Sequence, residues 1–145
     1  MDMFVPADFD PPARFETERF VLVPLGVEHN ERDHEAWMSS IDHIHATPGF
    51  PDGRWPHEMT LEENERDLAR HAQHFAERNG FTYTVLVGDE VVGCVYIYPS
   101  DGEADADVRS WVRASNAKLD VTLYEAVKWW LADAWPFERV DYAPR

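Results

Sequence analysis

The stretch that decides the fold is FTYTVLVGDEVVGCVYIYPSDGEADADVRSWVRASNAKLDVTLYEAVKWWLADAWPFERVDY, residues 81–142. It opens with two β-rich runs, Phe81–Val87 and Val91–Tyr98, and Gly88-Asp89-Glu90 between them is a tight-turn sequence. Three further elements follow: an alternating run at 108–113, a helix-period segment at about 120–134 and a short apolar run at 140–142. The stretch therefore predicts a hairpin, a third strand, a helix and a final strand.

The residues before this stretch predict one more strand and two helices. Residues 1–18 contain three prolines and several acids and predict an irregular N-terminal arm, and residues 19–25 predict a strand. A first helix begins at Asn30, since Asn is a favoured N-cap and apolar residues at helical spacing follow it. A second helix follows the capping box Thr60-Leu61-Glu62-Glu63 and ends at Asn79-Gly80.

The order of these elements predicts a single domain, residues 1–145, of the α/β (α+β) class. Its sheet is expected to be mixed and mostly antiparallel, with helices flanking it and five strands in all. The loop at residues 49–59 is rich in Pro, Gly and aromatic residues, and such a segment often covers a cleft.

Composition and charge exclude several classes of partner. The formal net charge of −15 argues against nucleic acid and anionic membrane surfaces, because binding to either needs basic patches. No apolar run approaches the ~20 residues of a membrane span, and the N-terminus lacks the features of a signal peptide. The sequence therefore predicts a cytoplasmic protein, and its single cysteine excludes an internal disulfide.

Three segments carry a resemblance to a known family. Glu16-Thr17-Glu18-Arg19-Phe20-Val21-Leu22-Val23-Pro24-Leu25, then Val91-Val92-Gly93-Cys94-Val95-Tyr96-Ile97, then Ser110-Trp111-Val112-Arg113 stand in the family's order. The chain is similar over about residues 16–142 to the GNAT N-acetyltransferases, especially those resembling ribosomal-protein N-terminal acetyltransferases. The resemblance implies a GNAT-like fold, truncated after the fifth strand, and acetyl transfer from acetyl-CoA to a small-molecule or peptide amine.

The resemblance also assigns the cofactor-binding residues. The backbone of Trp111, Val112 and Arg113 is expected to face the pantetheine arm of acetyl-CoA, while the following loop holds the pyrophosphate in the family. No glycine occurs after Gly102, so that loop lacks the residues that let a backbone approach phosphates. Asp120 is expected to cap the helix instead, with its carboxylate where a phosphate would lie.

Other candidates come from residue type and alternation. Arg109, Trp111 and Arg113 share one face of their strand and predict a carboxylate clamp, or else an exposed basic face. Tyr83, Tyr96 and Tyr98 predict the lining of a substrate pocket, or else core packing. His45, beside the 49–59 loop, is the candidate general base.

No metal site is predicted, since no Cys or Glu pattern completes a ligand set around His43, His45, His71 and His74. Two hypotheses of function stay open: an N-acetyltransferase, or a non-catalytic binding module that keeps the fold and holds a small metabolite or a protein partner. In both, the strand at 140–142 would leave an exposed sheet edge, which predicts a homodimer.

Overall fold

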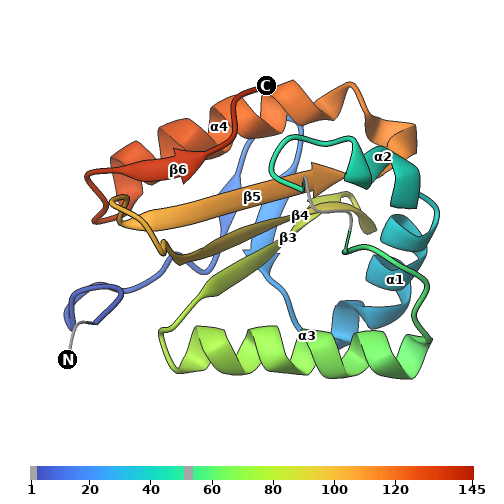
Figure 1. The fold of residues 1–145 in the computed structure, drawn as a ribbon, viewed down its shortest axis with the longest axis horizontal. Coiled ribbons are helices and arrows are strands. Elements are labelled where there is room, and N and C mark those ends of the chain that lie inside the picture. The colour runs from blue at the N-terminus through green and yellow to red at the C-terminus, as the bar shows by residue number, and fades with distance from the viewer. Residues whose placement is uncertain (1–2, 51–53) are drawn as a thin grey trace.

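The structure, a computed structural model, describes residues 3–50 and 54–145 (Figure 1). Within them, six strands form one sheet in the order β1-β2-β3-β4-β5-β6. Every neighbouring pair is antiparallel except β5 and β6, which are parallel. The strands are β1 (Phe15–Glu16), β2 (Val21–Pro24), β3 (Phe81–Val87), β4 (Glu90–Pro99), β5 (Ala106–Val112) and β6 (Val140–Tyr142). The predicted class, a mixed and mostly antiparallel sheet flanked by helices, is confirmed.

Helices fill the connections of this sheet. They are the 3-10 turns η1 (Val27–His29) and η2 (Ala114–Asn116) and the α-helices α1 (Asn30–Met38), α2 (Ile41–His45), α3 (Leu61–Ala76) and α4 (Leu119–Ala134). The capping box of α3 is present as predicted: Glu63 N donates to Thr60 Oγ1 at 3.1 Å, and Thr60 N donates to Glu63 Oε1 at 2.9 Å. In the described part of the chain, no helix is both long enough and apolar enough to cross a bilayer.

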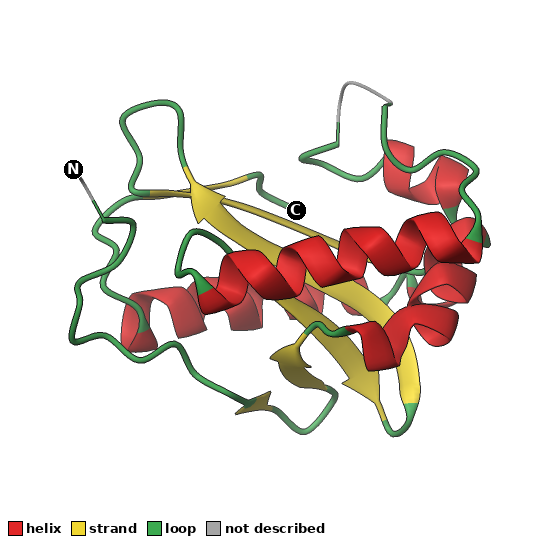
Figure 2. Ribbon diagram, turned by 90° about the horizontal axis from the view of Figure 1, so that it is seen from below, coloured by secondary structure: helices red, strands yellow, loops and turns green. Residues whose placement is uncertain are grey.

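The two faces of the sheet carry separate cores. Helix α4 lies on one face, and α3 lies on the other with α1 beside it, as Figures 1 and 2 show from two directions. The α4 core takes alternate strand residues such as Tyr83, Val95 and Val112. The opposite core takes their neighbours Cys94 and Trp111. This period of two decides which side chains reach a site on either face.

The β3–β4 hairpin forms as predicted and organises the sheet. Gly88 lies in the turn with a φ of 62°, a left-handed conformation that glycine adopts without strain. Phe81 pairs with Ile97 at one end and Val87 with Glu90 at the other. The long strand β4 then pairs along its length with β5.

Two local predictions differ from the structure. The first helix is divided, because α1 ends before Ser39 and α2 begins after Ser40; Ser39 Oγ donates to the Ala36 carbonyl, a contact that competes with regular helix. The N-terminal arm also contributes strand β1, which pairs Phe15 with Leu22, so the strand at 140–142 is the sixth rather than the fifth.

Strand β6 lies at the end of the strand order, so its outer edge pairs with no other strand of the described sheet. The homodimer expected from such an edge stays a prediction.

At Gly93 the paired strands β4 and β5 leave no room for a side chain, and this generates a stability prediction. A Cβ at Gly93 would lie 2.3 Å from the backbone oxygen of Trp111, which belongs to the paired strand β5 and cannot move independently. Gly93→Ala should therefore lower the free energy of unfolding by about 2–3 kcal/mol, measured by urea denaturation. Gly102→Ala is the matched control, because its nearest atom would be Ser100 Oγ at 3.7 Å. Equal stability of the two variants would contradict this contact.

Candidate functional site

A cavity of about 490 Å³ lies between α3 and the β4–β5 part of the sheet. Leu25, Phe50, Trp55, Leu68 and Tyr96 form its apolar surfaces. Its polar lining consists of Asp33, Asn64, Asp67, Arg70, His71, His74, Tyr98, Asp107 and Arg109. The cavity has the size of a small-molecule site, and most of its lining surface is apolar although polar residues outnumber apolar ones.

A buried carboxylate lies among the apolar residues of this cavity. Asp33, on α1, is only 4% exposed, and Asn64 Nδ2 donates to its Oδ2 at 3.0 Å. Asn64 is held in turn by Trp37 Nε1, which donates to its Oδ1 at 3.1 Å. Burial raises the pKa of Asp33 to about 6, and the Asn64 hydrogen bond opposes this shift only in part. Within residues 3–50 and 54–145, no ion pair includes Asp33.

A cluster of two histidines and a tyrosine lies at one side of the cavity. Tyr98 Oη is 2.7 Å from His71 Nδ1 and 2.9 Å from His74 Nδ1, and Thr82 Oγ1 is 3.1 Å from His71 Nδ1. A phenol has one proton, so Tyr98 donates to one ring and accepts from the other. Burial lowers the pKa of His71 to about 4, so His71 is neutral at neutral pH.

The histidine cluster does not form a metal centre. Among the described residues, no group of three or more His, Cys, Asp or Glu side chains is placed to hold a metal ion.

The remaining charges around the cavity form local pairs. Asp67 lies 3.0 Å from Arg70 on α3, and Asp107 lies 3.5 Å from Arg109 on β5. Arg109 therefore reaches the cavity, as the predicted clamp requires, but it does so with a carboxylate beside it. Asp33 differs from these acids, since its hydrogen-bond donor is neutral.

The structure brings together three of the predicted substrate residues and separates the fourth. Tyr96, Tyr98 and Arg109 line the cavity. Tyr83 belongs to the α4 core on the other face, where its hydroxyl donates to the Pro12 carbonyl at 2.7 Å and burial raises its pKa. The prediction for Tyr83 is wrong, because its position in β3 has the opposite parity to the cavity-facing positions.

His45 and Trp111 lie near the cavity without lining it. His45 Nε2 is 2.7 Å from the Pro56 carbonyl, a contact that fixes the ring against the loop. Trp111 is fully buried, and its Nε1 donates to Tyr96 Oη at 2.9 Å, so it supports the cavity wall from behind. His45, the predicted general base, is therefore not among the residues that line the cavity.

Sequence reasoning missed Asp33 and assigned no function to the α3 histidines. Asp33 lies in the first turn of α1, where acids are common, and its spacing of four residues before the buried Trp37 is the only local signal of an inward position. His71 and His74 were considered only as metal ligands, and nothing local in the sequence pairs them with Tyr98.

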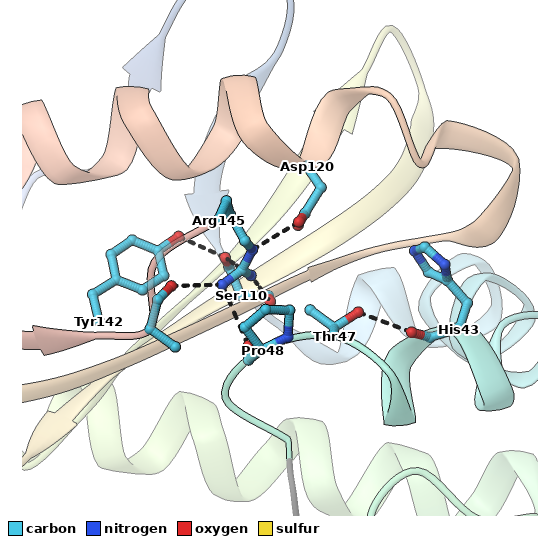
Figure 3. A network of polar contacts seen from close by, with 8 residues as sticks. His43, Thr47, Pro48, Ser110, Asp120, Tyr142 and Arg145 are labelled. Carbon is cyan, nitrogen blue, oxygen red and sulfur yellow. Dashed lines mark hydrogen bonds and ion pairs between the residues drawn. The ribbon is translucent and has the colours of Figure 1, made fainter.

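The predicted cofactor strand is occupied at its edge by a side chain of the same chain. Beyond the Val108–Tyr142 pair, β5 and β6 no longer pair. There Arg145 Nη2 donates to the Ser110 carbonyl at 2.8 Å and to Ser110 Oγ at 3.2 Å (Figure 3). Directly after β5, Arg113 N donates to the Val92 carbonyl, and the Arg113 side chain binds Glu35 at 2.7 Å.

Asp120 does not cap α4, so that prediction is wrong. The N-cap position is Lys118, and no side chain makes a capping hydrogen bond there. Asp120 Oδ2 instead accepts from Arg145 Nε at 2.7 Å (Figure 3). A charge-assisted bond to a buried guanidinium is stronger than a bond to one backbone amide, so the distant partner determines where the carboxylate lies.

Several backbone amides of the loop before α4 and of its first turn donate hydrogen bonds within the protein. The amides of Asn116, Ala117 and Asp120 donate to the carbonyls of Arg113, Ala114 and Ala117, and Ala114 N donates to Ser40 Oγ. These amides therefore do not point as free donors toward an anion. With Arg145 on the Ser110 carbonyl and Asp120 beside it, this arrangement does not fit the pantetheine and pyrophosphate of acetyl-CoA.

No protein-family model matches the chain, and neither does any curated protein sequence. Solved acetyltransferase structures do share its fold. One described as a ribosomal-protein-serine acetyltransferase from Vibrio cholerae has a TM-score of 0.69 and 13% identity, over 91% of this chain and 74% of that one. The ribosomal-protein-S5-alanine acetyltransferase from Vibrio fischeri has a TM-score of 0.66 and 15% identity, over 89% and 72%.

A third solved structure is a microcin C7 self-immunity acetyltransferase in complex with acetyl-CoA and AMP. It has a TM-score of 0.59 and 7% identity, over 86% of this chain and 70% of that one. At these identities the likeness establishes the fold, which is that of the GNAT acetyltransferases.

The pKa of His71 generates a pH prediction. Its folded value of about 4 lies below the ordinary 6.5, so the stability that neutral His71 contributes is full above pH 6.5 and is lost as pH falls through 4. Wild type should therefore lose about 3 kcal/mol over this window relative to His71→Asn, in urea denaturation at several pH values. His57→Asn, at an exposed position, is the control. An NMR titration that placed the His71 pKa above 6 would contradict the burial argument.

Proposed function

We propose that this GNAT-fold chain is a non-catalytic binding module that holds a small-molecule amine in the cavity between α3 and the sheet. The observation that carries the proposal is the carboxylate of Asp33, which lines an aromatic cavity while bonded to a neutral amide. A buried carboxylate is unfavourable without a charged partner. A ligand ammonium group would supply that partner.

The surroundings of Asp33 suit the rest of such a ligand. Trp55 and Tyr96 line the cavity with rings whose centroids are 6.4 Å apart in an edge-on arrangement, and Phe50 lies 6.1 Å from Trp55. Ring faces attract cations and bury apolar groups, so an amine with an apolar or aromatic body fits both parts of the cavity. The acidic net charge of the chain favours cations over anions.

The contacts of Arg145 at the edge of β5 support binding without acetyl transfer. In the family that the sequence resembles, this strand and the loop after it hold acetyl-CoA. Here Ser110 is bonded to Arg145, and the amides of Asn116 and Ala117 donate to carbonyls of the same segment. The fold is therefore proposed to persist as a scaffold for the cavity.

Acetyl transfer to an amine is the second candidate, and the neutral His71 favours it. A histidine that is unprotonated at neutral pH, within the same cavity as a bound amine, could accept a proton from it. Isothermal titration with acetyl-CoA separates the two candidates: the binding module gives no heat at micromolar concentrations. Micromolar binding, together with amine-dependent release of free thiol, would establish the transferase and overturn the proposed module.

The amine proposal predicts a difference between matched ligands. 2-Phenylethylamine should bind at least about tenfold more tightly than 2-phenylethanol, because only the amine pairs with Asp33. Asp33→Asn should remove this preference in calorimetry, whereas Asp133→Asn, at an exposed position of α4 on the opposite face, should keep it. Equal binding of amine and alcohol by wild type would refute the role of Asp33.

The same variant should be more stable than wild type. The folded pKa of Asp33, about 6, is above its ordinary 3.8, so the folded state prefers the protonated form and loses stability as pH rises from 3.8 through 6. Asp33→Asn does not titrate, and at pH 8 it should raise the free energy of unfolding by about 3 kcal/mol, measured by urea denaturation. The gain should vanish near pH 3.5. A variant less stable than wild type at pH 8 would show that the carboxylate is structural.

A further inference from the structure

We propose that the edge of β5 at Ser110 carries a guanidinium-binding site, which Arg145 of the same chain fills as an internal ligand. The site consists of the Ser110 carbonyl and hydroxyl, the Asp120 carboxylate, the carbonyls of Pro48 and Ala143, and two tyrosine rings. It lies apart from the amine cavity, and the inference does not depend on which ligand that cavity takes.

The hydrogen-bond acceptors match a guanidinium group in number. Arg145 Nε donates to Asp120 Oδ2 at 2.7 Å, and Nη1 donates to the carbonyls of Ala143 at 2.9 Å and Pro48 at 3.3 Å. Nη2 donates to the carbonyl and hydroxyl of Ser110 at 2.8 and 3.2 Å. A guanidinium has five N–H donors in a planar fork, so each donor has an acceptor. An ammonium group has three donors and would leave acceptors unused.

Two aromatic rings complete the site. The guanidinium carbon of Arg145 lies 5.7 Å from the Tyr124 ring centroid and 5.8 Å from that of Tyr142, both within the range of a cation–π contact. The two rings lie 4.7 Å apart, and the Tyr142 and Ser110 hydroxyls are hydrogen-bonded to each other. The Arg145 side chain is only 3% exposed, so this is an enclosed site rather than a surface ion pair.

The site joins segments that are distant in the sequence. Pro48 precedes the cavity loop, Ser110 belongs to β5, Asp120 to α4 and Ala143 to the chain after β6, and Figure 3 shows Pro48, Ser110 and Asp120 around the guanidinium. Two residues after Pro48, Phe50 lines the amine cavity. Arg145 thus connects α4 and the end of β6 to one wall of the cavity, and it occupies the edge of β5 that a bound molecule would otherwise reach.

Chemical rescue tests this site. Arg145→Ala removes the guanidinium and the two methylene groups next to it, and ethylguanidinium replaces these atoms. The melting temperature of Arg145→Ala should fall, and millimolar ethylguanidinium chloride should restore it in a saturable manner, whereas ethylammonium chloride at equal concentration should not. Wild type, whose site is filled, should show no rise. The double variant Arg145→Ala/Asp120→Asn should not be rescued. Rescue by ethylammonium, or none by ethylguanidinium, would overturn the proposal.

A second measurement applies if Arg145→Ala does not fold. In wild type, NMR should show exchange of the Arg145 Nε–H with water slowed by at least about a hundredfold relative to exposed arginines such as Arg14. Arg145→Lys, which keeps the charge, should melt below wild type because it supplies fewer donors. A fast-exchanging Nε–H would show that the guanidinium is open to water. Equal melting temperatures of wild type and Arg145→Lys would show that the site recognises charge alone. Either result would overturn the proposal.

Discussion

The pairing of β4 with β5 is the constraint on which both sites depend. Opposed residues share a face, so Tyr96 and its partner Arg109 lie on the cavity side. Ser110, the next residue of β5, belongs to the other set and hydrogen-bonds to Tyr142, a member of the α4 core. Strand β5 thus supplies Asp107 and Arg109 to the cavity and Ser110 to the guanidinium site. A register shift of one residue would exchange the two sets and destroy both sites.

The chain buries two charges and treats them differently. The guanidinium of Arg145 has a carboxylate, four further oxygen acceptors and two rings around it, which together offset its desolvation. Asp33 has one neutral amide donor and a pKa raised to about 6. The guanidinium is therefore fully partnered, whereas Asp33 is incompletely partnered in a cavity, and this difference supports the proposed amine site.

Local patterns in the sequence predicted the fold well and the polar sites poorly. The hairpin, the capping box at Thr60 and the final strand depend on turn residues, capping chemistry and alternation within a few positions, and all three are present. The predicted cap at Asp120 is wrong because its partner, Arg145, is 25 residues away in the sequence and binds the carboxylate in place of a local amide. The predicted pocket position of Tyr83 is wrong because alternation within one strand does not show which of its two sets of side chains faces α3 and which faces α4. Such contacts depend on the packed arrangement rather than on neighbours in the chain.

The sign of the net charge connects these observations. A formal charge of −15 creates a field that attracts cations and disfavours a ligand as anionic as coenzyme A. Three amides of the loop before α4, those of Ala114, Asn116 and Ala117, donate within the protein, and the Asp120 carboxylate pairs with Arg145. The cavity is lined by the carboxylate of Asp33, and the carboxylate of Asp120 accepts from the guanidinium of Arg145. A GNAT-fold protein that takes a cation at each of these places is electrostatically consistent throughout, whereas one that binds acetyl-CoA would have to do so against its own field.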